Sequence, residues 1–121
     1  MVELTGILAE ALVMISFEPL GAETRIILPE AVGPIVQGRV RRFLLGNAEA
    51  YAARNAEGFW PGIGAKPQRA TIYDVIGLSS AALEELANMI LADSAAVALH
   101  VRLPNGTAGC FTRAAIEADP V

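Results

Sequence analysis

The chain has 121 residues, with 54% hydrophobic content, one cysteine, one histidine and a net charge of −4 from 9 basic and 13 acidic side chains. A single cysteine excludes an intramolecular disulfide, and one cysteine with one histidine is too few for a structural zinc site of Cys and His ligands. The acidic balance argues against a protein that coats nucleic acid, because that role needs Lys and Arg to neutralise phosphates.

The length suits one domain, and the hydrophobic content is ample for one core over residues 1–121. The apolar run from Ile7 to Phe17 is interrupted by Glu10 and is too short to span a bilayer. No basic run precedes it, so we expect a cytoplasmic protein without a membrane segment. The mean hydropathy of +0.46 is high for a small domain. It predicts exposed apolar surface and self-association.

The N-terminal part predicts a β-hairpin over about residues 11–28. The sequence EPLG at residues 18–21 has turn chemistry, and Thr24 to Leu28 has the composition of a strand. Residues 1–10 fit a helix or a strand, and the sequence does not decide between them.

A long helix is predicted from about Pro34 to Arg54, since proline suits the first helical turn. Gly38 and Gly46 either weaken this helix or mark places where another backbone comes close. The apolar residues that recur at three- and four-residue spacing, and so predict its buried face, are Ile35, Val36, Val40, Phe43, Leu44 and Tyr51.

The middle of the chain predicts an irregular loop over Gly58 to Arg69, which is rich in glycine and proline. A short strand is expected at Ala70 to Ile76. A second helix follows over about Ala81 to Ala92, with Ser79 or Ser80 as its N-cap. The residues that this helix should bury are Leu83, Leu86, Ala87 and Ile90.

The C-terminal part predicts a hairpin in which residues 97–103 and 108–112 pair around Asn105-Gly106, the preferred two-residue type I′ turn. Counting outward from this turn places Leu103 opposite Ala108, Val101 opposite Cys110 and His100 opposite Phe111. Cys110 should therefore face the core, and His100 should lie on the other face with Phe111.

Chemistry-bearing residues are few, and no catalytic set, metal site or cofactor is expected. His100 is the one side chain suited to proton transfer near neutral pH, but a lone histidine in a hairpin is more often a packing partner. The predicted register separates it from Cys110, so the two should not form a nucleophile and its base. Together these residues make an enzyme the less favoured reading.

A contact surface is the stronger expectation. Phe59 and Trp60, flanked by glycines, would either close the end of the core or anchor a partner. The helix arginines, Arg39, Arg41 and Arg42, could form one basic face with three downstream cations, or simply a solvated helix face. The downstream cations are Arg54, Lys66 and Arg69.

The order of these features resembles the small morphogenesis or tail-assembly proteins of tailed bacteriophages and prophages. The resemblance covers about residues 30–113: a helix ending in a basic cluster (30–54), a loop with aromatics and glycines (58–69), then β segments and a closing hairpin. It implies a subunit that assembles into rings at the neck or tail of the particle, without catalysis. It transfers no functional residue.

The sequence thus predicts an α+β domain with a small, mostly antiparallel sheet and one long and one shorter helix packed on it. We expect a structural or assembly subunit that forms a homo-oligomer or joins other subunits, in the cytoplasm or in a virion-like particle. The alternative is a small bacterial enzyme or ligand-binding domain with a pocket near His100, where Tyr51 or Tyr73 would supply polar contacts. A third reading is a regulatory adaptor that uses the arginines against an acidic partner or nucleic acid.

Overall fold

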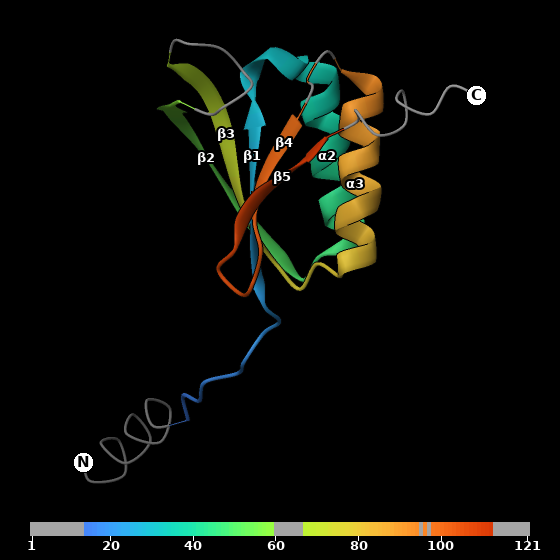
Figure 1. Ribbon diagram of the computed structural model, residues 1–121. Coiled ribbons are helices and arrows are strands. Elements are labelled where there is room, and N and C mark those ends of the chain that lie inside the picture. The colour runs from blue at the N-terminus through green and yellow to red at the C-terminus, as the bar shows by residue number, and fades with distance from the viewer. Residues whose placement is uncertain (1–13, 60–66, 95, 97, 113–121) are drawn as a thin grey trace, which may run out of the picture.

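The computed structural model describes residues 14–59, 67–94, 96 and 98–112. Its elements run in chain order as a strand, two consecutive helices, a strand pair, a further helix and a closing strand pair (Figure 1). They are β1 (Glu23–Pro29), the 3-10 helix η1 (Glu30–Val32), α2 (Gly33–Asn47), β2 (Ala50–Gly58), β3 (Gln68–Ile76), α3 (Ser80–Asp93), β4 (Ala98–Arg102) and β5 (Ala108–Thr112).

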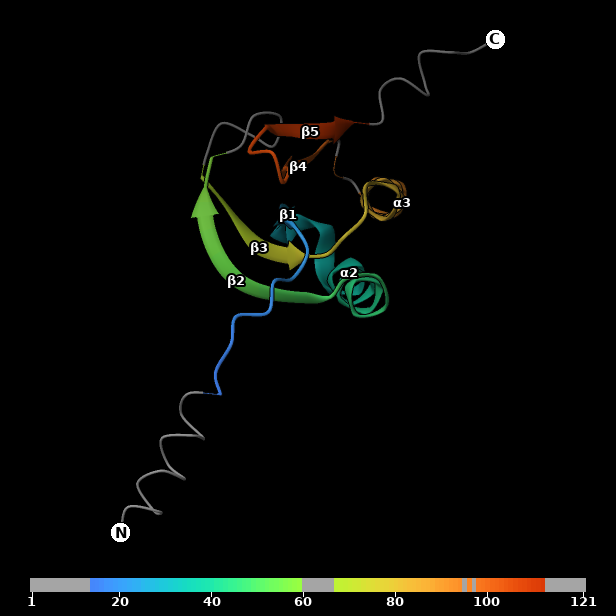
Figure 2. The ribbon, with the colours of Figure 1, turned by 90° about the horizontal axis from the view of Figure 1, so that it is seen from below.

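The described strands form one sheet in the order β2-β3-β1-β4-β5, with antiparallel neighbours. Both helices, α2 and α3, lie side by side on one face of it (Figures 1 and 2). The path β1-α2-β2-β3-α3-β4 is the ferredoxin-like arrangement, and β5 extends the sheet beside β4. The predicted α+β class is confirmed.

The core lies between the helices and the face of the sheet that they cover. Ile26 and Leu28 of β1 alternate with residues of the other face, as expected for a strand covered on one side. Each fully buried side chain of this size stabilises the fold by about 1.5–3 kcal/mol relative to an exposed one. The helices contribute their apolar stripes, Val36, Val40 and Leu44 from α2 and Leu83, Leu86, Ala87, Ile90 and Leu91 from α3.

A short hydrogen-bonded chain links α2 to the sheet inside this core. The buried Tyr73 hydroxyl donates to Gln37 Oε1 at 2.7 Å, and Gln37 Nε2 donates to Thr71 Oγ1 at 3.3 Å. Burial raises the pKa of Tyr73, and the nearby charge of Arg41 only partly opposes this. These two hydrogen bonds hold α2 against β3 and satisfy polar groups that would be costly to bury without a partner.

Helix α3 confirms its prediction closely. The Ser79 side chain accepts a hydrogen bond from the backbone N–H of Ala82 at 3.1 Å, which is the expected N-cap. All four residues predicted to be buried in this helix are buried.

The long helix is shorter than predicted. It ends at Asn47, and Ala50–Gly58 form β2, which pairs with β3 along its whole length. Tyr51 therefore lies in a strand, and Ile35, predicted to be buried, is 73% exposed. Alanine, arginine and glutamate suit a helix, but pairing with a distant strand overrides that local preference.

The N-terminal hairpin prediction is wrong in its first strand. Described residues 14–22 contain no strand, while residues 11–13 lie outside the described part. The second strand, β1, is the central strand of the sheet, and β3 and β4 occupy both of its edges. No free edge beside β1 remains for the preceding residues.

The C-terminal hairpin exists, but its register differs by one residue. Leu103 N–H donates to the Thr107 carbonyl, and Gly106 N–H donates to the Leu103 carbonyl, each at 2.8 Å. The predicted turn would have needed an N–H from Pro104, which proline lacks, so the loop is one residue longer and Gly106 adopts φ 91°. His100 consequently pairs with Cys110, and Leu99 with Phe111.

This shift exchanges the two faces of β5. Phe111 packs against the core and Cys110 is exposed, the reverse of the prediction. The loop predicted over Gly58–Arg69 is also shorter, because β2 reaches Gly58 and β3 begins at Gln68. Residues 60–66 lie outside the described part.

Candidate interaction surface

Of the two aromatic residues predicted to contact a partner, Phe59 lies among the described residues. Phe59 follows the end of β2 and is 59% exposed, so it does not close the core. Trp60 lies outside the described residues.

The predicted arginines do not share one face. Arg39 reaches across to α3, where its Nη1 contacts Asp93 Oδ2 at 2.5 Å. Arg41 lies near Tyr73 on the sheet side, and Arg42 is exposed. At about 100° per residue around a helix, Arg39 and Arg42 lie about 60° apart on one side of α2, whereas Arg41 points about 160° away from Arg39.

The downstream cations are dispersed as well. Arg54 pairs with Ile72 in register and so lies on the open face of the sheet, opposite the helices. Arg69 lines a pocket at the end of β3, and Lys66 is outside the described residues. A single basic face therefore does not form from the described arginines.

The open face of the sheet carries a charged cluster centred on Asp74. Arg25 Nε lies 2.8 Å from Asp74 Oδ1, and Arg54 Nη1 lies 2.5 Å from Asp74 Oδ2. Burial alone would raise the pKa of Asp74, but the hydrogen bonds from the two arginines outweigh it and hold the pKa below its usual value. Arg102, directly opposite Arg25, adds a further cation.

His100 and Cys110 are neighbours on the same open face, with Ile27 on the other side of His100. His100 Nδ1 is buried without a hydrogen-bond partner, so this nitrogen does not hold the imidazole to an acid, as an oriented general base requires. The ring centroids of Tyr51 and Tyr73 lie 5.9 Å apart, with the rings tilted by 52° to each other, on the opposite, helix-covered face. The residues of the predicted pocket thus do not converge.

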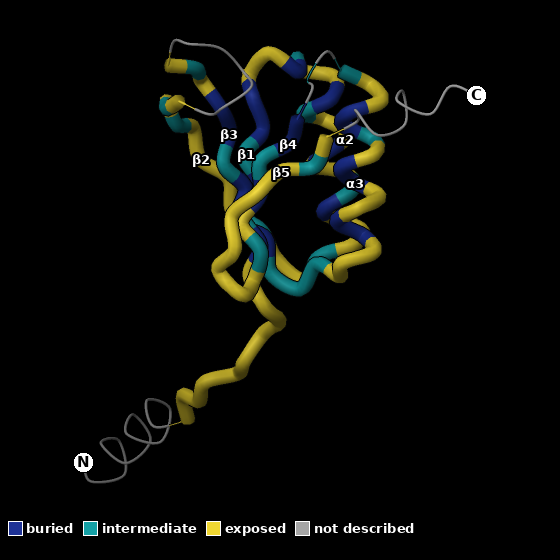
Figure 3. The backbone as a smooth tube through the Cα atoms, in the orientation of Figure 1, coloured by how far each residue is buried: buried dark blue, intermediate teal, exposed yellow. Residues whose placement is uncertain are grey.

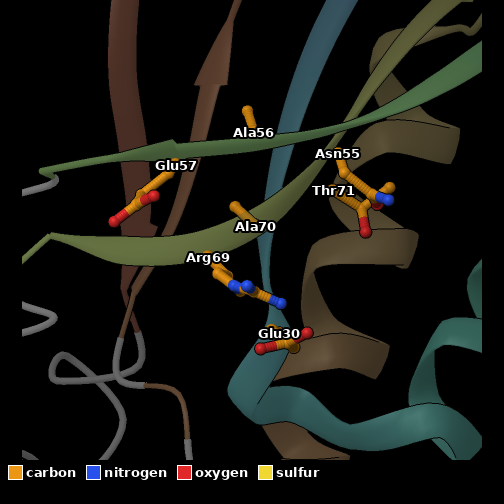
Figure 4. A pocket seen from close by; sticks show the side chains of 7 residues that line it. All are labelled: Glu30, Asn55, Ala56, Glu57, Arg69, Ala70 and Thr71. Carbon is orange, nitrogen blue, oxygen red and sulfur yellow. The ribbon is translucent and has the colours of Figure 1, made fainter.

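A pocket of about 430 Å³ lies where β2 ends and β3 begins (Figure 4). The side chain of Arg69 extends toward Glu30. Asn55 and Thr71 lie side by side, and the side chain of Glu57 points away from them. The lining combines carboxylates, a guanidinium, an amide and a hydroxyl, which can bind polar groups but contains no nucleophile paired with a base.

The most exposed apolar side chains lie in the segment before β1, which we call the apolar arm (residues 14–20). Its large residues are Met14 (77% exposed), Ile15 (80%), Phe17 (89%) and Leu20 (60%). Figure 3 shows this segment exposed along its length and leading away from the domain. Among the described residues, its one hydrogen bond joins Ser16 to Glu18, inside the arm.

The root of the arm is fixed to the lower end of the sheet. Gly21 N–H donates to Glu49 Oε1 at 2.7 Å, and Gly77 N–H donates to the Ala22 carbonyl at 2.9 Å. The sequence predicts a strand for part of this apolar run. The run is exposed instead, because β1 is central and β3 and β4 occupy both of its edges.

No group of three or more potential metal ligands occurs among the described residues. No helix in that part of the chain has the length and apolar character needed to cross a membrane. No family model, curated protein or solved structure matches this chain significantly.

Proposed function

We propose that the chain is a non-catalytic structural subunit that self-associates through its apolar arm. The observation that carries this proposal is the arm itself, in which four large apolar side chains are between 60% and 89% exposed. Contiguous apolar exposure of this kind marks contact surfaces, because water contact with these groups is unfavourable.

The enzyme alternative has less support. His100 Nδ1 has no hydrogen-bond partner, and Tyr51 and Tyr73 lie on the other face of the sheet. The ferredoxin-like arrangement decides nothing, because this fold serves many unrelated functions. We further propose a neck or tail ring of a phage-like particle as an assembly that would use such a subunit.

The test is the solution mass by light scattering over a concentration range, at low and high salt. We expect an oligomer that persists at high salt, because apolar contacts are not screened. Replacing Ile15 and Phe17 with serine should weaken association more than tenfold, since burying each side chain contributes about 1.5–3 kcal/mol.

The matched control replaces Ile35 and Leu45 of α2 with serine. These two residues are also large and apolar, and they are 73% and 75% exposed. This control should keep the mass of the unmodified chain. A monomer at every concentration, or equal weakening in both variants, would refute the proposal.

A further inference from the structure

Strand β2 is an edge strand of unusual openness. It has nine residues, and within the described part of the chain its outer edge has no neighbouring strand. An unpaired edge presents a row of backbone N–H and C=O groups that can accept another strand. Most of its residues are exposed because β2 curves away from the helices toward its end (Figure 2).

A second β2 is a poor occupant of this edge. Two copies pairing antiparallel about a two-fold axis would bring their middle residues together, and the middle residue of Ala50–Gly58 is Arg54. Like charges directly opposite each other destabilise a strand pair. The edge therefore favours a strand that carries an acidic residue.

The apolar arm has the required properties. It is extended, its apolar side chains are exposed, and it carries Glu18. The contact between Arg54 Nη1 and Asp74 leaves other guanidinium donors for an incoming carboxylate. Pro19 would end the pairing just after Glu18, because proline cannot donate to a ladder.

The arm of the same chain is badly placed to occupy this edge. It starts at Gly21, beside β1, and must pass under β3 and β2 to reach the outer side of β2. That crossing covers about three strand spacings, or about 14 Å, and uses about four residues at 3.3 Å each. About three of the residues in 14–20 would remain for pairing.

We propose, building on the proposed function, that residues 14–18 of one copy add as a strand to the outer edge of β2 in a second copy. Backbone hydrogen bonds supply the pairing, Glu18 lies near Arg54, and Ile15 and Phe17 share one face of the added strand. Because the arm and the β2 edge are different surfaces, the contact gives a reciprocal dimer, a ring or a chain.

Disulfide trapping tests this contact in the full chain with Cys110→Ser. One copy carries Ser16→Cys, and a second copy of different size carries Ala52→Cys or Ala56→Cys, which lie on the same face of β2 as Arg54. We expect the mixture to form a reducible link between the two sizes for at least one position, and neither copy to link alone.

Three results would overturn the inference: links between Ala52→Cys or Ala56→Cys copies alone, links between Ser16→Cys copies alone, or no link at any position. If the chain still self-associates in light scattering, such a result rejects the arm-to-edge contact and leaves the proposed function standing. A monomer rejects the proposed function itself.

Charge reversal provides a second measurement. Glu18→Lys should weaken association about two- to fivefold, the range expected for losing an oppositely charged cross-strand pair. Glu85→Lys, an exposed acid on α3, is the control for net charge and should leave association unchanged. Equal effects of the two variants would contradict pairing beside Arg54.

Discussion

Asp74 is the residue on which the charges of the open sheet face converge, with Arg25 and Arg54 on its two carboxylate oxygens. Three strands meet at these contacts, β1, β2 and β3. The cluster therefore holds the outer strand β2 in register as well as balancing charge.

Because the pKa of Asp74 is lower in the folded chain than its ordinary value of about 3.9, its ionised form stabilises the fold. This contribution is complete above about pH 4–5 and is lost as the pH falls through the folded pKa. Asp74→Asn should lower the free energy of unfolding at pH 7 by on the order of 1 kcal/mol.

The measurement is urea unfolding at pH 7 and pH 3, where the difference from the unmodified chain should shrink at the lower pH. Asp93→Asn, which removes the more exposed pair with Arg39, is the control and should change stability by less than about 0.5 kcal/mol. A loss that is equal at both pH values would show that the charge of Asp74 is not responsible.

At the level of elements, the sequence predicted best what depends on neighbours along the chain. Helix α3 follows from its apolar spacing and from Ser79, both local signals. Strand β2 could not be found this way, because its alanine-rich sequence becomes a strand only by pairing with β3. The predicted register of the β4–β5 hairpin is wrong by one residue, because Pro104 has no N–H to close the two-residue turn that Asn105-Gly106 predicts.

The candidate surface was predictable only in part, for the same reason. Exposed apolar surface followed from the high hydropathy, and Phe59 is indeed exposed. Where that surface lies depends on β1 being central, because β3 and β4 then occupy both edges of β1 and neither edge is open to the arm. The strand order β2-β3-β1-β4-β5 arises from contacts between distant segments, which local patterns do not encode.

Helix α2 offers a test of element stability at Gly38. The sequence left open whether another backbone approaches this glycine, and a Cβ placed there meets nothing within 4 Å. Gly38→Ala should therefore stabilise the protein by about 0.5–1 kcal/mol through helix propensity.

Gly77→Ala is the contrasting substitution, measured by the same urea unfolding. Gly77 has φ +79°, and an added Cβ would lie 2.6 Å from Glu49 Cγ, so we expect a loss of stability of more than about 1 kcal/mol. If Gly38→Ala destabilised the protein, another group would have to pack on that face of α2. If Gly77→Ala left the stability unchanged, the backbone around Gly77 would have to shift at no cost to fit the added Cβ.

At the scale of the whole molecule, the sheet is protected unevenly. Strand β1 is paired on both edges and buried against the helices, whereas, within the part of the chain that the structure describes, β2 has a free edge and the arm has no partner strand. Amide hydrogen exchange should follow this order, because exchange needs the local hydrogen bonds to open. In dilute solution, we expect slow exchange in β1, faster exchange in β2 and free exchange at residues 14–18.

Raising the protein concentration should change this pattern at two places together. If the arm of one copy pairs with β2 of another, the amides of residues 14–18 and the outward-facing amides of β2 become protected at the same concentration, while β1 and α3 stay as they were. Mass spectrometry of peptic fragments resolves these segments. The Ile15 and Phe17 serine variant should abolish both changes, and protection of the arm without protection of β2 would place its binding surface elsewhere on the domain.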